Sequence, residues 1–132
     1  MVSSGTGLFG EEKFDQFNNW FSSLPQSMYP KDFLYWDGKG LCWLYLYDEK
    51  MNVPSAFEIV DFEGGLYSVA TDIDQKTNMN AMKTAVDQFL DENGFTRDDS
   101  RFELGNIITS PKAKEILGCC QMDYYTPVKP KA

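Results

Sequence analysis

The chain has 132 residues, enough for one domain with a sizeable hydrophobic core. Its net charge of −8, from 20 acidic and 12 basic residues, argues against direct binding to nucleic-acid phosphates or to anionic membranes. Because there is no histidine, Ser-His-Asp and Cys-His catalysis, histidine metal sites and histidine-ligated haem are excluded.

The cysteines and the apolar runs indicate a cytoplasmic protein. Cys42, Cys119 and Cys120 are odd in number, and the vicinal pair is poorly placed to form its own disulfide. Two thiols without further ligands make a weak metal site, so we expect no metal and no cofactor. No apolar run approaches 18 residues, and the first residues lack the pattern of a signal peptide. We therefore expect a soluble intracellular protein without a membrane span.

The first third of the chain predicts a loose start, a helix and a hairpin. Residues 1–10 are rich in Gly and Ser and are interpreted as a flexible N-terminus. From Glu11 to Pro25 the apolar residues recur with helical spacing. This stripe consists of Phe14, Phe17, Trp20, Phe21 and Leu24. A short strand at 33–36 then leads through the turn 37–40 into a strand at 41–47.

The strand 41–47 alternates between two kinds of apolar side chain. Trp43, Tyr45 and Tyr47 share one face, because successive side chains of a strand point to opposite sides. The opposite face carries Cys42, Leu44 and Leu46. We interpret the aliphatic face as packing under helices and the aromatic face as the wall of a binding cleft. The alternative is a sheet buried on both sides, in which the rings only fill volume.

The remainder of the chain predicts further strands and a second helix. Strands are expected at 56–60, 66–71, 101–108 and 121–128, with one helical turn within 110–118. The second helix runs from about Asn80 to Asn93, with Asn78 or Asn80 as its cap and Gly94 at its left-handed end.

This order of elements predicts an α+β fold built from tandem helix–strand–strand units with pseudo-twofold symmetry. Both helices are expected on one face of a mainly antiparallel sheet, and the aromatic side chains on the other. The expected shared core contains Phe17, Phe21, Leu44, Leu46, Val86 and Phe89. A sheet covered by helices on one face only is typical of a binding platform.

Several segments, in this order and spacing, resemble the GyrI-like small-molecule-binding domain. They are 57–70 (FEIVDFEGGLYSVA), 89–90 (FL), 93–95 (NGF), 102–104 (FEL) and 122–129 (MDYYTPVK). This family includes the effector-binding modules of bacterial multidrug-sensing transcription regulators. The resemblance covers residues 11–129, which we therefore expect to form a single GyrI-like ligand-binding domain.

The resemblance implies a groove between two helix–strand–strand units, where lipophilic and often cationic compounds meet a glutamate among aromatic rings. Carried over by motif, that glutamate is Glu103. The chain departs from the family at two places. The strand before the first helix is missing or degenerate in the sequence, and Gly105 stands where the family often has an aromatic residue, which is expected to widen the pocket.

The residues themselves also give a reason to consider Glu103. Phe102 and Leu104 point to one face of the expected strand, so Glu103 points to the other. If that face carries the aromatic cleft, desolvation should raise the pKa of this carboxyl group, and a bound cation would restore its charge. In the alternative, Glu103 lies at the sheet rim, solvated or paired with Arg101.

The expected ligand-binding residues are therefore one carboxylate and five aromatic side chains. They are Glu103, Trp43, Tyr45, Tyr67, Tyr125 and Trp20. Tyr67 and Tyr125 match family positions, whereas Trp43 and Tyr45 are inferred from alternation alone. No catalytic constellation stands out in the sequence.

Three functions remain open at this point. The first is a sensor or sequestering protein for lipophilic, cationic or aromatic molecules, with a separate DNA-binding regulator as a candidate partner. The second is a hydrolase of reactive cyclopropane-bearing toxins, which some members of the family are, using Glu103 with Tyr67 or Tyr125. The third is an interaction with DNA gyrase, as in other members. The ligand and the oligomeric state are not specified by the sequence.

Overall fold

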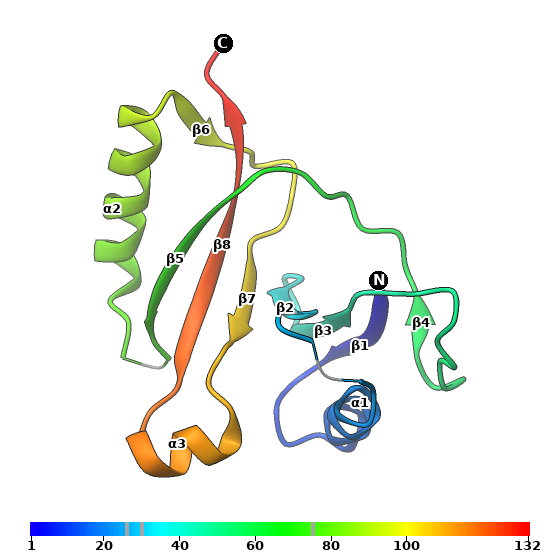
Figure 1. The fold of residues 1–132 in the computed structure, drawn as a ribbon. Coiled ribbons are helices and arrows are strands. Elements are labelled where there is room, and N and C mark those ends of the chain that lie inside the picture. Colours follow the sequence, from blue (N-terminus) through cyan, green and yellow to red (C-terminus); the bar gives the residue numbers. More distant parts are fainter. Residues whose placement is uncertain (26, 30, 75) are drawn as a thin grey trace. The chain divides into compact units, whose positions relative to one another are not determined.

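A computed structural model describes residues 1–25, 27–29, 31–74 and 76–132. Over these residues the chain has three helices and eight strands (Figure 1). It divides into two compact units, Met1–Phe62 and Glu63–Ala132, and the strand pairs within each unit are antiparallel. The predicted α+β class with mainly antiparallel β-structure is confirmed.

The first unit consists of a strand, a helix and a hairpin, completed by a short fourth strand. Its elements are β1 (Val2–Gly7), α1 (Glu12–Ser22), β2 (Asp32–Trp36), β3 (Leu41–Tyr45) and β4 (Glu58–Ile59). The strand order is β4-β1-β3-β2. The predicted turn between β2 and β3 is closed by the carboxylate of Asp37, which accepts hydrogen bonds from the backbone N–H groups of Lys39 and Gly40.

Strand β1 corrects the prediction that residues 1–10 are loose. Val2–Gly7 pairs with both β3 and β4, so backbone hydrogen bonds hold a segment whose composition suggests a loop. The register shifts between Ser3 and Thr6, where Gly5 has a φ of 75°. The Ser4 hydroxyl accepts a hydrogen bond from the backbone N–H of Trp43, 3.1 Å away. The strand before the first helix is therefore present.

The core of the first unit is aromatic. Phe17 of α1 is fully buried and forms a cluster with Val2, Tyr45 and Phe57. The ring centroids of Phe17 and Phe57 lie 5.0 Å apart in an edge-to-face arrangement. Such pairs are favoured by the ring quadrupoles in addition to the burial of apolar area.

The second unit repeats the strand–helix–hairpin plan with extra elements. These are β5 (Tyr67–Ile73), α2 (Met79–Glu92), β6 (Phe95–Arg97), β7 (Leu104–Ile107), α3 (Pro111–Leu117) and β8 (Gln121–Pro130). The strand order is β7-β8-β5, and β6 pairs with the end of β8. Helix α2 runs beside β5 and also contacts β6 (Figure 1). Its core residues, Val86 and Leu90, pack with Val128.

The sequence signals for the ends of α2 are confirmed. The side chain of Asn78 accepts a hydrogen bond from the backbone N–H of Ala81 at 3.0 Å, and Gly94 has a φ of 79°.

Two residues of the predicted core are exposed instead. Phe89 is 56% exposed, so its predicted place in the core is wrong. The positions that face the strands in the second half of α2 are Val86 and Leu90, spaced four residues apart. Leu46, which lies beyond the end of β3, is likewise exposed.

Candidate functional site

In the first unit, the aromatic face of β3 packs against α1. The ring centroids of Trp20 and Tyr45 lie 5.8 Å apart, and those of Phe21 and Trp43 lie 5.1 Å apart. Tyr45 is 6% exposed, and this burial, with a smaller contribution from Asp32, raises the pKa of its phenol. The interpretation of the Trp43 and Tyr45 face as the wall of an open cleft is therefore wrong.

The physical reason lies in the composition of α1. Its inward stripe contains Phe14, Phe17 and Phe21, so rings of the helix and rings of the strand fill the same layer. Trp20 belongs to this layer too, and its indole N–H donates to the backbone carbonyl of Asn52 at 3.3 Å. These contacts account for the positions of Trp20, Trp43 and Tyr45. Contact of any of them with a ligand stays a prediction.

The opposite face of the hairpin carries aromatic residues that the sequence argument did not select. The register places Phe33 opposite Leu44 and Tyr35 opposite Cys42, and directly opposed residues share a face. Burial raises the pKa of Tyr35 to about 12, with smaller contributions from Cys42 and Asp37. The alternation in 33–36 could have indicated this pair, but the longer run at 41–47 is the stronger pattern.

In the second unit, Tyr67 and Tyr125 lie together on one face of the β5–β8 pair. Their ring centroids are 6.3 Å apart at 81°. The guanidinium of Arg101 lies 4.9 Å from the centroid of Tyr67. Arg101 is held there by Asp98, at 2.9 Å, and by a 2.9 Å hydrogen bond to the carbonyl of Leu66. The ring of Tyr67 therefore already has a cationic neighbour from its own chain.

Glu103 lies immediately before β7, and its side chain is 66% exposed. Its carboxylate accepts a hydrogen bond from Arg97 Nη1 at 2.8 Å, and Arg97 Nε donates to Asp87 of α2 at 2.5 Å. The register places Leu104 opposite Tyr125, so Glu103 is on the other face, the one that α2 covers. The prediction of a desolvated carboxylate on the aromatic face is wrong, and the cation that pairs with Glu103 is Arg97 rather than Arg101.

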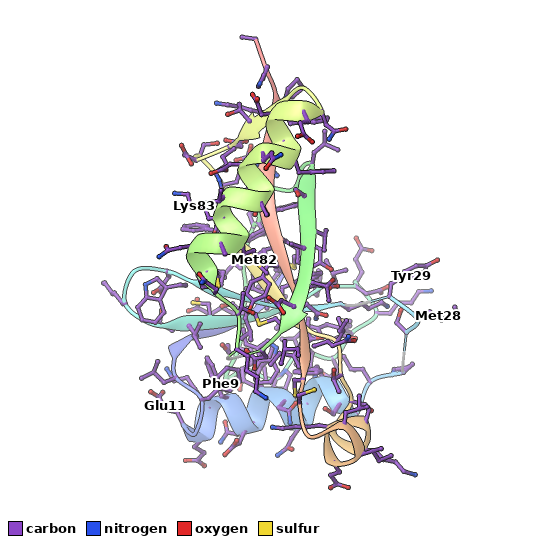
Figure 2. The ribbon with its side chains drawn as sticks, turned by 90° about the vertical axis from the view of Figure 1, so that its left-hand side faces the viewer. Phe9, Glu11, Met28, Tyr29, Met82 and Lys83 are labelled. Atoms are coloured by element: carbon purple, nitrogen blue, oxygen red, sulfur yellow. The ribbon has the colours of Figure 1, made fainter. Side chains whose placement is uncertain are left out.

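A groove of about 350 Å³ opens beside α2 in this unit, and Glu103 lines it. Apolar lining comes from Met79, Met82, Val86 and Tyr124. Charged lining comes from Lys83, Arg97, Asp99 and Glu103. Figure 2 shows Met82 and Lys83 on α2, and Met82 lies toward the strands in this view.

Tyr124 is the aromatic side chain that shares the α2 face with Glu103. Its hydroxyl lies 3.2 Å from Thr77 Oγ1, next to the start of α2. The register sets Gly105 opposite Tyr124, so no side chain of β7 lies directly opposite the ring. Tyr125 also contributes to the lining of the groove, although its ring packs with Tyr67 on the other side.

The structure thus brings together Trp20 with Tyr45, and Tyr67 with Tyr125. Glu103 lies in the groove beside α2, to whose lining Tyr125 also contributes. Sequence reasoning missed Arg97, Asp99 and Tyr124 at this groove. Arg97 belongs to β6, a three-residue strand too short to give a periodic signal.

Comparison with models of known protein families and with curated protein sequences gave no match. Among the described residues, none of the helices is long and apolar enough to span a membrane. In the same part of the chain, no three Cys, Asp or Glu side chains are grouped as metal ligands would be.

Proposed function

We propose that the second unit binds lipophilic small molecules that carry a positive charge, in the groove beside α2. The observation that carries this proposal is the combination of flexible thioether and aromatic lining with an exposed carboxylate, at Met79, Met82, Tyr124 and Glu103. Methionine side chains adapt to irregular ligands, and aromatic faces attract cations.

The ion network supports a cationic ligand. Arg97 bonds to two carboxylates, Asp87 and Glu103, so the three groups together carry one negative charge. Glu103 is the more exposed of the two carboxylates and lines the groove, as does Asp99. A ligand ammonium group can therefore bind Glu103 without displacing Arg97 from Asp87.

We further propose that the chain is a GyrI-like module, in which two repeated units are related by a pseudo-twofold axis with both helices on one face. The repeat within the chain supports this. β1, α1, β2 and β3 follow one another as β5, α2, β7 and β8 do, and the strand orders β1-β3-β2 and β5-β8-β7 correspond. In this proposal the protein is a sensor or sequestering protein in the cytoplasm, acting with a separate regulator.

Hydrolysis and gyrase binding stay predictions. For hydrolysis, the expected pair of Glu103 with Tyr67 or Tyr125 is not favoured, because the two tyrosine rings lie on the face opposite the Glu103 carboxylate.

The proposal is tested by titrating a cationic dye and a neutral analogue of the same shape against three variants. We expect Glu103→Gln to weaken binding of the cationic dye about two- to fivefold, because an exposed ion pair contributes roughly 0.5–1 kcal/mol. Arg97→Gln should strengthen cation binding, since a competing cation is removed from Glu103. Glu115→Gln, on exposed α3, removes the same charge outside the groove and is the matched control.

The two probes separate the charge effect from a general disturbance of the groove. The neutral analogue should bind all variants with similar affinity. Equal weakening of both probes in Glu103→Gln, or weakening of the cationic dye by Arg97→Gln, would contradict the proposed role of Glu103.

A further inference from the structure

The second unit has a second recognition feature, the free edge of β5. Just beyond its two ends, Val128 N donates a hydrogen bond to Leu66 O (3.0 Å) and Asp74 N donates one to Cys120 O (2.9 Å). In an antiparallel pair, hydrogen-bonded residues alternate with non-hydrogen-bonded ones. The backbone groups of Ser68, Ala70 and Asp72 therefore bond to β8. The backbone N–H and C=O groups of the intervening residues of β5 point away from β8, toward the free edge of the sheet.

This edge is exposed over a short length. In the described part of the chain, β5 pairs with β8 alone, at one end of the strand order of its unit. Val69 and Thr71 are both exposed. Ile73 closes the edge, because its carbonyl accepts from Lys76 N at 3.2 Å and from Thr77 Oγ1 at 2.9 Å. The open backbone groups are thus those of Tyr67, Val69 and Thr71, which suit one short added strand.

A groove of about 370 Å³ runs along this edge, between β5 and α2. It is a different groove from the one that Glu103 lines, and it lies on the other flank of the helix. The helix contributes Ala81, Ala85 and Phe89 to its wall, and β5 contributes Ala70 and Asp72. The small alanine side chains account for the space, and they leave the ring of Phe89 exposed at one end.

The charge of this region indicates the chemistry of the partner. Asp72 is exposed and lines the groove. Within the described part of the chain, its carboxylate accepts a hydrogen bond from the adjacent backbone N–H of Ile73 and from no other group. Asp74 follows it, and the whole chain has a net charge of −8. A basic side chain at this end of the edge would therefore be attracted. A second copy of the chain would bring further negative charge instead.

We propose that β5 is a docking edge for an extended basic segment of a partner protein, which adds to it as an antiparallel strand. Residues of the segment that face Ser68 and Ala70 place apolar side chains in the groove, and the residue that faces Asp72 is Lys or Arg. Backbone hydrogen bonds to Tyr67, Val69 and Thr71 provide affinity, and the alternate side chains provide selectivity.

The probe for the experiment is the peptide acetyl-Gly-Lys-Thr-Val-Thr-Val-Gly-amide, in which Lys faces Asp72 and the two Val residues face Ala70 and Ser68. Amide hydrogen exchange of the full chain is measured by NMR with and without the peptide. We expect fast exchange at Val69 and Thr71 in the free protein and at least tenfold slower exchange at saturating peptide. Ala70, which bonds to β8, serves as the internal reference.

Two modified peptides test the geometry of docking. N-methylation of both Thr residues removes the N–H groups that point at β5 and should abolish the protection. N-methylation of both Val residues alters N–H groups that point away from β5 and should leave most of it. Equal behaviour of the two peptides, or no protection by the parent peptide, would overturn the proposal.

Three variants identify the surface and the occupant. Ala85→Phe fills the groove without touching the edge and should weaken peptide binding at least tenfold, while Asp72→Asn should weaken it several-fold and reduce its salt dependence. Val69→Pro removes an edge N–H that does not bond to β8, and it should weaken peptide binding several-fold. Slow exchange at Val69 without peptide, in a dimer that Val69→Pro dissociates, would assign the edge to a second copy and overturn the proposal.

Discussion

The two units share one chain order of strand, helix and hairpin, yet they use the face of their helix differently. In the first unit, α1 presents large rings, and the rings of β3 meet them in a closed aromatic layer. In the second unit, α2 presents Ala81, Met82 and Ala85, and grooves open on both of its flanks. The size of the side chains on the helix therefore decides whether its flanks are filled by a closed aromatic layer or left as open grooves.

The largest expected effect tests whether the aromatic layer is the main source of stability of the first unit. Phe17→Ala should lower the free energy of unfolding by about 3–5 kcal/mol, because it removes a fully buried ring and leaves a cavity. Phe89→Ala, at an exposed site on α2, should cost less than about 1 kcal/mol. Urea denaturation of both variants measures the difference. Similar losses would mean that the two helix faces do not differ in the way described.

The next prediction concerns the tight contact that fixes the start of β5. A Cβ at residue 65 would lie 2.3 Å from Arg101 Nη1, whereas one at residue 64 would meet nothing within 4 Å. We expect Gly65→Ala to destabilise the protein by roughly 1–3 kcal/mol through overpacking, and Gly64→Ala to have little effect. Thermal unfolding compares the pair. Equal melting temperatures of the two variants would mean that the Arg101 side chain can move aside and does not fix the start of β5.

Acid sensitivity should arise in both units through different carboxylates. The pKa of Asp98 is lowered from 3.8 to about 2, first by the Ser100 hydroxyl and then by Arg101. The Thr6 hydroxyl, with the backbone of the 37–40 turn, holds the pKa of Asp37 well below its usual range. A lowered folded-state pKa stabilises the protein above the unfolded value, near pH 4, and this contribution is lost as the pH falls.

Unfolding should therefore become easier between about pH 4 and pH 2, and Asp98→Asn should flatten this dependence relative to the unsubstituted chain. Denaturation at a series of pH values provides the measurement, with Asp99→Asn as a control for the loss of one neighbouring charge. An unchanged slope in Asp98→Asn would show that the Asp98–Arg101 pair does not couple the stability of the second unit to pH.

The smallest effect is expected at the ion network of the groove. Glu103→Gln should change the free energy of unfolding by less than about 1 kcal/mol, because the carboxylate is largely exposed. The effect should shrink further at high salt, since exposed pairs are screened. Denaturation at low and high salt checks this. A loss of several kcal/mol would make Glu103 a structural residue and weaken its assignment to ligand binding.

Local patterns in the sequence predicted the elements well. The helical spacing of apolar residues predicted α1 and α2, Asn78 and Gly94 marked the ends of α2, and the 37–40 segment predicted the hairpin turn. These features depend on neighbours within a few residues, so the sequence by itself determined them. The α+β class follows from their order.

Tertiary structure alone decided what each strand face meets. Alternation shows that Trp43 and Leu44 point in opposite directions, but not which of them faces α1. The same ambiguity put Glu103 on the aromatic face in the sequence argument, whereas Arg97 and Asp87 hold it on the side of α2. β1 was missed because its stability comes from pairing with strands more than 30 residues away in the chain. Contacts between residues far apart in the chain determine which element each strand face packs against, and local sequence patterns do not contain this information.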